Sequence, residues 1–262
     1  MWPFSPKPLL EPHLADWVFD QADWLLRHHV HAAVFARAQL LPLSAKAFQL
    51  PSAGGHERAR ALFAQVKTFC GVAHTEMTLV ERGDSGRFRS ARGLAPQPKS
   101  GPAGTYRKRN GAIEISYDSS MAPADLVAVF AHEIAHAVLG FGAATPPPGD
   151  AEFEELRTDF TAIFMGFGLY LLQFRAGPGP ATPEMAHEFR KVYMYYMNAR
   201  EISFTTALFC EIREVERSLL IRHAPTTTAW AIKRAYADLD RRAQEVSELR
   251  VFAKRRAILA ES

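Results

Sequence analysis

The chain has few cysteines, a small net charge and no long hydrophobic run, and each of these shortages argues against a class of protein. Its two cysteines, Cys70 and Cys210, stand in neither a CxxC nor a CxxH setting. They provide no disulfide framework, so we expect two buried thiols in a reducing compartment. A formal net charge of +3 is small for 262 residues and gives no reason to expect a nucleic-acid partner.

The composition also argues against a membrane anchor. The longest apolar stretch, from Thr161 to Phe174, is too short and too rich in glycine to span a bilayer. The residues from Met1 to Pro8 lack a charged segment followed by an apolar one, so we expect no signal peptide. These observations predict a cytoplasmic protein without a membrane span.

Hydrophobic periodicity predicts an α+β fold, in which a few short strands in the first half precede a mostly helical second half. The expected helices span residues 14–30, 55–71, 121–139, 151–174, 184–198, 201–222 and 226–258. The expected strands or extended segments span 36–43, 77–80 and 111–117, and a long loop is expected over 83–110. We treat residues 1–262 as one domain, with an α/β part (1–120) and a helical part (121–262).

The run His132-Glu133-Ile134-Ala135-His136 carries the strongest chemical signal. Positions i and i+4 lie one above the other on a helix, so His132 and His136 can present both imidazoles to one metal ion. Glu133 is turned by about 100° around the helix axis, which places its carboxylate beside the metal, where it can take a proton from a bound water. Zinc lowers the pKa of that water toward ~7. The surrounding residues are apolar, and three buried polar groups require a common partner, which a metal supplies.

A catalytic zinc needs a third protein ligand and an open fourth position. No histidine follows His136 at the spacing HExxHxxGxxH, so the next predicted helix has to provide the ligand. That helix offers Glu152, Glu154, Glu155 and Asp159. Glu155 and Asp159 stand at i and i+4 and share a face, so one carboxylate can bind the metal while the other accepts a hydrogen bond from a ligand histidine. Glu152 and Glu154 remain alternatives for the third ligand.

The two motifs together resemble the gluzincins, zinc peptidases whose HExxH helix is followed by a second helix bearing ExxxD. The segment Glu155-Leu156-Arg157-Thr158-Asp159 matches the second motif, and 18 residues separate it from the first. The resemblance implies that Glu155 completes the zinc site of the two histidines. It also implies that Asp159 orients His132 and that Glu133 is the general base.

The resemblance further implies a zincin-like fold, in which a small mixed sheet has an edge strand beside the HExxH helix. In that fold an extended substrate pairs with the edge strand. Residues 112–117 are the candidate for this strand, although their pattern is equally typical of a core strand. The phrases AHEIAHAVLG, EELRTDFTAIFMGFG and MNAREISFTTALFCEIR are also similar to a group of uncharacterised bacterial proteins with predicted HExxH sites, over roughly residues 55–215.

The expected activity is zinc-dependent hydrolysis of a peptide bond in a peptide or protein substrate. The alternative is a zinc-binding regulatory protein on the same scaffold that is catalytically silent. The intact Glu133 favours the enzyme, because a purely structural zinc site has no need of a base. The group that stabilises the oxyanion is left open among residues of the C-terminal half. These are Tyr193, Tyr195, Tyr196, Arg200 and His223. Arg200, next to Glu201, is the candidate for a cation that faces the site, and a surface ion pair is its equal alternative.

Overall fold

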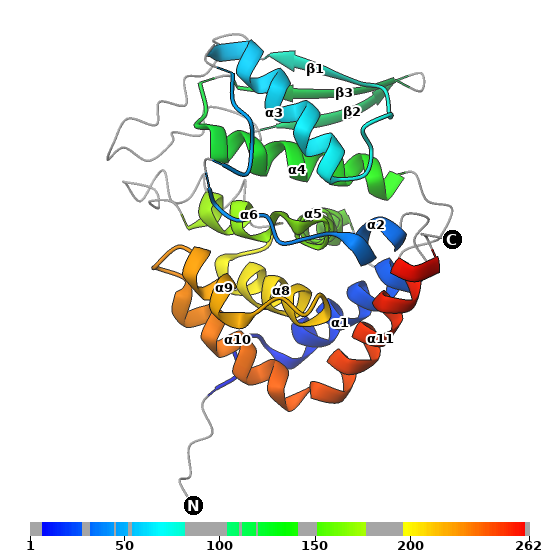
Figure 1. Cartoon of the computed structure of the whole chain (residues 1–262), viewed down its shortest axis with the longest axis vertical. Helices are drawn as coiled ribbons and strands as arrows, with labels where there is room; N and C mark the ends of the chain where they lie inside the picture. The colour runs from blue at the N-terminus through cyan, green and yellow to red at the C-terminus, as the bar shows by residue number, and fades with distance from the viewer. Residues whose placement is uncertain are drawn as a thin grey trace, which may run out of the picture.

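A small mixed sheet lies at one end of a mostly helical chain, which confirms the α+β class (Figure 1). The computed structural model describes residues 7–27, 32–44, 46–51, 54–81, 104–109, 112–118, 120–140, 151–176 and 196–259. The strands are β1 (Met77–Glu81), β2 (Thr105–Arg109) and β3 (Ala112–Tyr117). The helices are α1 (Pro12–Arg27), α2 (Ala32–Arg37), α3 (Gly55–Phe69), α4 (Pro123–Gly140), α5 (Ala151–Ala162), the π-helical η1 (Ile163–Phe167), α6 (Gly168–Arg175), α8 (Ala199–Ile212), α9 (Arg217–His223), α10 (Ala229–Arg241) and α11 (Ala243–Leu259).

The strand expected at the edge of the sheet is at its centre. The strand order is β1-β3-β2, with β3 parallel to β1 and antiparallel to β2. The edge strand that lies against α4 is therefore β2, inside the segment 83–110 that was expected as a loop. Its sequence, Thr-Tyr-Arg-Lys-Arg, ends in three consecutive basic residues. An edge strand tolerates such charges. Because of them, however, the sequence lacks the alternation of apolar and polar residues that predicts a strand.

Helix α4 is enclosed by other elements, which explains its apolar composition. It packs against α3, α5 and α6 and touches β2 and β3. Its Phe130 meets Phe63 of α3 at a ring-centroid distance of 5.3 Å and Tyr117 of β3 at 5.6 Å. In Figure 1 the sheet and α3 lie on one side of α4, and α5 and α6 lie on the other. The polar side chains of the HExxH motif are thus carried into the interior and need partners there.

The helix predicted at 151–174, which carries the ExxxD motif, is present but is interrupted. The elements α5, η1 and α6 follow one another without a gap, and the interruption lies at Gly166, whose φ of 100° is not helical. The carbonyl of Gly166 accepts a hydrogen bond of 3.1 Å from the backbone N–H of Leu41. A Cβ at this position would lie 2.1 Å from the backbone oxygen of Gln39. The residues after α2 therefore pass so close to the helix that only glycine fits.

Other predicted elements differ from the structure in detail. The strand or extended segment predicted at 36–43 is not a strand, because α2 continues to Arg37 and residues 38–42 have no regular structure. The helix predicted at 201–222 is divided into α8 and α9 near Glu214, whose φ is 55°, and the helix predicted at 226–258 is divided into α10 and α11. The helix predicted at 184–198 falls almost entirely outside the described residues.

Two expectations from composition agree with the structure. Cys70 and Cys210 are buried and free. Burial raises the pKa of both thiols above the ordinary value, so neither is activated as a nucleophile. None of the helices in the described part of the chain combines the length and hydrophobicity that a bilayer span requires.

The substitution Gly166→Ala tests the close approach at η1. We expect it to lower the free energy of unfolding by more than about 2 kcal/mol, because it adds a backbone clash to an unfavourable φ. Gly55→Ala is the matched control, since Gly55 also has a positive φ, of 56°, but has open space around it. The control should cost only about 1 kcal/mol. Equal losses in urea unfolding of the two variants would contradict the close approach.

Candidate metal centre

Two imidazoles and one carboxylate meet between α4 and α5. The Nε2 atoms of His132 and His136 lie 3.0 Å and 3.4 Å from the same oxygen of Glu155, Oε2. Ligand atoms of the three residues all lie within 4.8 Å of one another. Two atoms bound to zinc at 2.0–2.1 Å and at a tetrahedral angle would lie about 3.3 Å apart. The three side chains are thus spaced as ligands of one metal ion.

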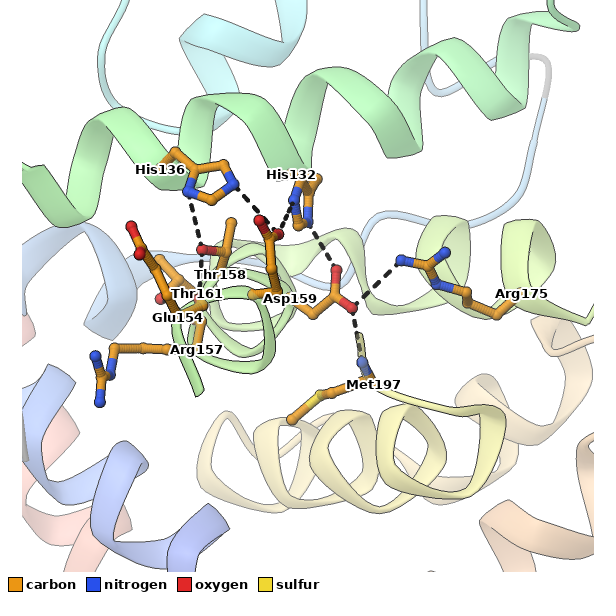
Figure 2. A network of polar contacts seen from close by, with 10 residues as sticks. His132, His136, Glu154, Arg157, Thr158, Asp159, Thr161, Arg175 and Met197 are labelled. Atoms are coloured by element: carbon orange, nitrogen blue, oxygen red, sulfur yellow. Dashed lines mark hydrogen bonds and ion pairs between the residues drawn. The ribbon is translucent and has the colours of Figure 1, made fainter. Parts of the chain in front are cut away.

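The ring of His132 is oriented by a buried carboxylate from α5. Its Nδ1 donates a hydrogen bond of 2.8 Å to Oδ1 of Asp159 (Figure 2). The other oxygen of Asp159, Oδ2, accepts a hydrogen bond of 3.0 Å from the backbone N–H of Met197 and lies 3.5 Å from the guanidinium of Arg175. Asp159 is 1% exposed, so each of its oxygens is satisfied by protein. This arrangement turns Nε2 of His132 toward Glu155.

The ring of His136 is oriented by a residue that the sequence analysis did not single out. The hydroxyl of Thr158 donates its one proton to the backbone carbonyl of Glu154, at 2.8 Å. It can therefore only accept from Nδ1 of His136, which lies 3.2 Å from it (Figure 2). Nδ1 of His136 then carries the proton, and Nε2 keeps its lone pair for a metal. Thr158 lies between the two acids of the ExxxD motif, where the structure gives it a role of its own.

The electrostatics of the site favour a cation. Burial lowers the pKa of His132, but the hydrogen bonds to Asp159 and Glu155 raise it by more, to about 10. Burial raises the pKa of Glu155, but its hydrogen bonds to both histidines bring it below the ordinary value. Burial likewise raises the pKa of Asp159, and the charge of Arg175 together with the hydrogen bond from His132 lowers it overall.

Counting charges leads to the same conclusion. Glu133, Glu155 and Asp159 contribute three negative charges, and Arg175 contributes one positive charge. Two negative charges remain uncompensated among these four side chains when both histidines are neutral. A divalent cation bound between the histidines would balance them, and uncompensated buried charge is costly.

Glu133 lies beside this group and is not part of it. Its side chain is buried, at 5% exposure, and its charge contributes to the raised pKa of both His132 and Tyr196. A Cβ on Gly104, at the start of β2, would lie 2.5 Å from Oε1 of Glu133. The carboxylate is therefore packed under the backbone that leads into the edge strand and close to the candidate metal ligands. This is the relation that the position next to His132 predicts.

The structure separates the alternatives for the third ligand. The group that could hold a metal contains Glu155, whereas Glu154 is exposed and does not belong to the group. The side chain of Glu152 lies outside the described residues. Among the residues that can be placed, the arrangement favours Glu155.

The structure also distinguishes between the candidates for the oxyanion donor. The ring of Tyr196 lies 5.3 Å from the ring of His132, whereas Arg200 is exposed and lies over the ring of Trp230 at 5.5 Å. The hypothesis of a site-facing Arg200 is therefore not supported, because this guanidinium is occupied at the surface. Among the described residues, the cation at the site is Arg175, which lies over the ring of Tyr196 at 4.6 Å. Arg175 ends a helix and has no motif that could have identified it.

The remaining candidates contribute nothing that can be placed at the site. His223 ends α9, and Tyr193 and Tyr195 lie outside the described residues.

Burial, followed by the charges of Glu155 and Glu133, raises the pKa of the Tyr196 phenol above the ordinary value. Its hydroxyl therefore keeps its proton at neutral pH and can donate a hydrogen bond.

Comparison of the chain with models of protein families, with curated proteins and with solved structures found no match. The chemistry of the site is therefore inferred from its own residues. What they provide is a buried group of two imidazoles and a carboxylate, each with an identified orienting partner or shared contact.

Replacing Thr158 tests the orientation of His136. The isosteric change Thr158→Val removes the acceptor of the Nδ1 proton, and we expect zinc affinity to fall about tenfold, as measured by competition with a chelator. Thr161→Val is the matched control, because Thr161 is also buried on α5 and bonds the backbone carbonyl four residues back, that of Arg157. Within the described residues, its hydroxyl bonds to this carbonyl and to neither histidine. Equal zinc affinities of the two variants would refute the role of Thr158.

The raised pKa of His132 predicts how zinc binding depends on pH. Because the metal-free imidazole titrates near 10, it is protonated at neutral pH, and a metal must displace that proton to bind Nε2. Zinc affinity should therefore rise with pH by up to about tenfold per unit below 10, with release of about one proton. Calorimetry in buffers of different ionisation enthalpy measures this release. Asp159→Asn removes one cause of the raised pKa and should reduce the release near pH 8. Zinc binding without proton release would contradict the prediction.

Proposed function

We propose that the chain is a zinc-dependent peptidase of gluzincin type on a zincin-like fold. The observation that carries this proposal is the grouping of His132, His136 and Glu155 around one point, with the carboxylate of Glu133 packed beside them. Three protein ligands leave a fourth position for water and substrate, whereas a structural zinc site is usually closed by four.

The donor set supports zinc over calcium and magnesium. Calcium and magnesium prefer oxygen ligands, and two of the three donors here are imidazole nitrogens. Both imidazoles are oriented through Nδ1, one by Asp159 and one by Thr158, as is usual for histidines that bind a metal. When bound, zinc would lower the pKa of a water molecule and polarise the carbonyl of a substrate.

The side chains of the site divide the remaining work of hydrolysis. The carboxylate of Glu133 accepts the proton of the attacking water and passes it to the leaving amine. Its burial beneath Gly104 fixes its position and excludes competing solvent. Tyr196, whose ring lies beside His132 and whose hydroxyl keeps its proton, would donate a hydrogen bond to the developing oxyanion. Arg175 holds the ring of Tyr196 and the carboxylate of Asp159 together.

The choice of a peptide as substrate rests on β2. This strand borders α4, and in the described part of the chain it pairs with β3 alone. An extended peptide can therefore pair with the other edge of β2 and lay its backbone across the metal site. The role given to residues 112–117 in the sequence analysis passes to 105–109, because β3 has neighbours on both sides.

The substitution Glu133→Gln separates metal binding from turnover. We expect this variant to keep stoichiometric zinc and to lose peptidase activity by at least about a hundredfold, because the amide cannot accept the proton. His132→Ala and Glu155→Ala should lose zinc. Glu154→Gln, one residue from the ligand but exposed, should keep both zinc and activity. Activity is followed on a mixture of unstructured peptides by mass spectrometry.

Two results would overturn this assignment. Full zinc binding by Glu155→Ala would show that the third ligand is another residue. Peptide cleavage that persists in Glu133→Gln would show that another group is the base. Zinc bound by the wild type without cleavage of any peptide would favour the catalytically silent alternative.

A further inference from the structure

Gly104 and Tyr106, at the start of the edge-strand segment, each contact a residue of the HExxH motif on α4. Gly104 immediately precedes β2, and Tyr106 is its second residue. Alternate residues of an extended segment point to the same face, so both face α4. Gly104 lies against Glu133, and Tyr106 lies against His136. Opposite Tyr106 on β3 stands Ile115, which is fully buried, so this face of the sheet is the inner one.

The contact of Tyr106 with His136 is a stacked pair. The ring centroids lie 5.8 Å apart, and the ring planes differ by 17°. Thr158 holds the edge of the same imidazole through Nδ1. A hydrogen bond restrains the ring in its plane but allows it to tilt, whereas a stacked aromatic ring opposes the tilt. The two contacts together fix the direction of the Nε2 lone pair.

The contact of Gly104 with Glu133 depends on the absence of a side chain. A Cβ at residue 104 would lie 2.5 Å from Oε1 and 2.9 Å from Cγ of Glu133, and 2.6 Å from Cγ1 of Val129. The backbone of Gly104 is not in the left-handed region, since the described glycines with positive φ are others. Alanine is therefore compatible with the backbone here, and its methyl group would act by displacing the carboxylate of Glu133.

We propose that the inner side of β2 positions the catalytic apparatus, with Tyr106 holding the metal ligand His136 and Gly104 setting the place of the base Glu133. Each acts through another side chain, Tyr106 through His136 and Gly104 through Glu133, so both are positioning residues. The proposal rests on the proposed function, because it gives both residues a role at the same metal site. It adds that the strand beside the site shapes the zinc centre itself, in addition to any pairing with substrate.

Tyr106 is tested through zinc affinity, measured on the full chain by competition with a chelator. Tyr106→Leu removes the stacked ring and should weaken zinc binding about three- to tenfold, whereas Tyr106→Phe keeps the ring and should bind within about twofold of the wild type. Arg107→Leu is the matched control, because Arg107 is the next residue of the strand, is exposed and faces away from α4. A purely structural role of Tyr106 would lower the stability of the metal-free protein and leave zinc affinity unchanged, and that result would overturn the assignment.

Gly104 is tested with cobalt in place of zinc, because the absorption of cobalt reports the deprotonation of its bound water. In Gly104→Ala the metal should bind with affinity within about twofold of the wild type, since no ligand is moved. The midpoint of the pH titration should shift in the same direction as in Glu133→Gln. A midpoint equal to that of the wild type would overturn the role of Gly104.

Two further comparisons keep the outcomes distinct. If Gly104→Ala does not fold, Gly104→Ala/Val129→Ala removes the second clash, and Val129→Ala becomes its reference. If the wild type binds neither zinc nor cobalt, or binds them equally after His136→Ala, the proposed metal centre itself fails. If the wild type binds metal through His136 and the variants of Tyr106 and Gly104 match their controls, only the role of β2 fails.

Discussion

The hydrogen bond between His132 and Asp159 is the interaction on which the arrangement around the site depends. It joins α4 to α5 in the interior, where neither group can be left to water. Asp159 in turn requires donors for its second oxygen, which come from the backbone of Met197 before α8 and from Arg175 at the end of α6. One buried carboxylate thus ties four elements of the chain to the position of one imidazole. This explains why the residues that hold the site come from segments far apart in sequence.

The enclosure of α4 determines the character of the site. Because the sheet, α3, α5 and α6 surround this helix, its two histidines and one glutamate lie in a region of low dielectric. Charges there interact strongly, which is why the pKa of His132 is raised and those of Glu155 and Asp159 are lowered. The excess of negative charge among these buried groups, with both histidines neutral, would favour binding of a divalent cation. The burial of these groups and their suitability for a metal are therefore two consequences of the same packing.

The interruption at Gly166 shows how α6 is brought to the site. The π-helical segment interrupts the helix that carries Glu155 and Asp159, and the residues after α2 pass close to it, where Leu41 donates a hydrogen bond to Gly166. Beyond this point α6 packs beneath α4, and Arg175 returns to Asp159. Segments of π-helix are rare and frequently occur at functional sites. Here one continuous stretch of chain contributes the candidate ligand Glu155 on one side of the segment and the compensating cation Arg175 on the other.

The sequence by itself determined the features that depend on local spacing. Residues four apart on a helix share a face whatever the rest of the fold does, so His132 with His136, and Glu155 with Asp159, could be paired without a structure. The helical second half and the strand at 112–117 follow from periodicity for the same reason. The tertiary structure alone decided what depends on contacts between distant residues. It placed β2 at the edge of the sheet, where basic side chains conceal a strand, and set Tyr106 and Gly104 against His136 and Glu133. It also brought Arg175 to Asp159, because packing and charge compensation, and no local pattern, select that partner.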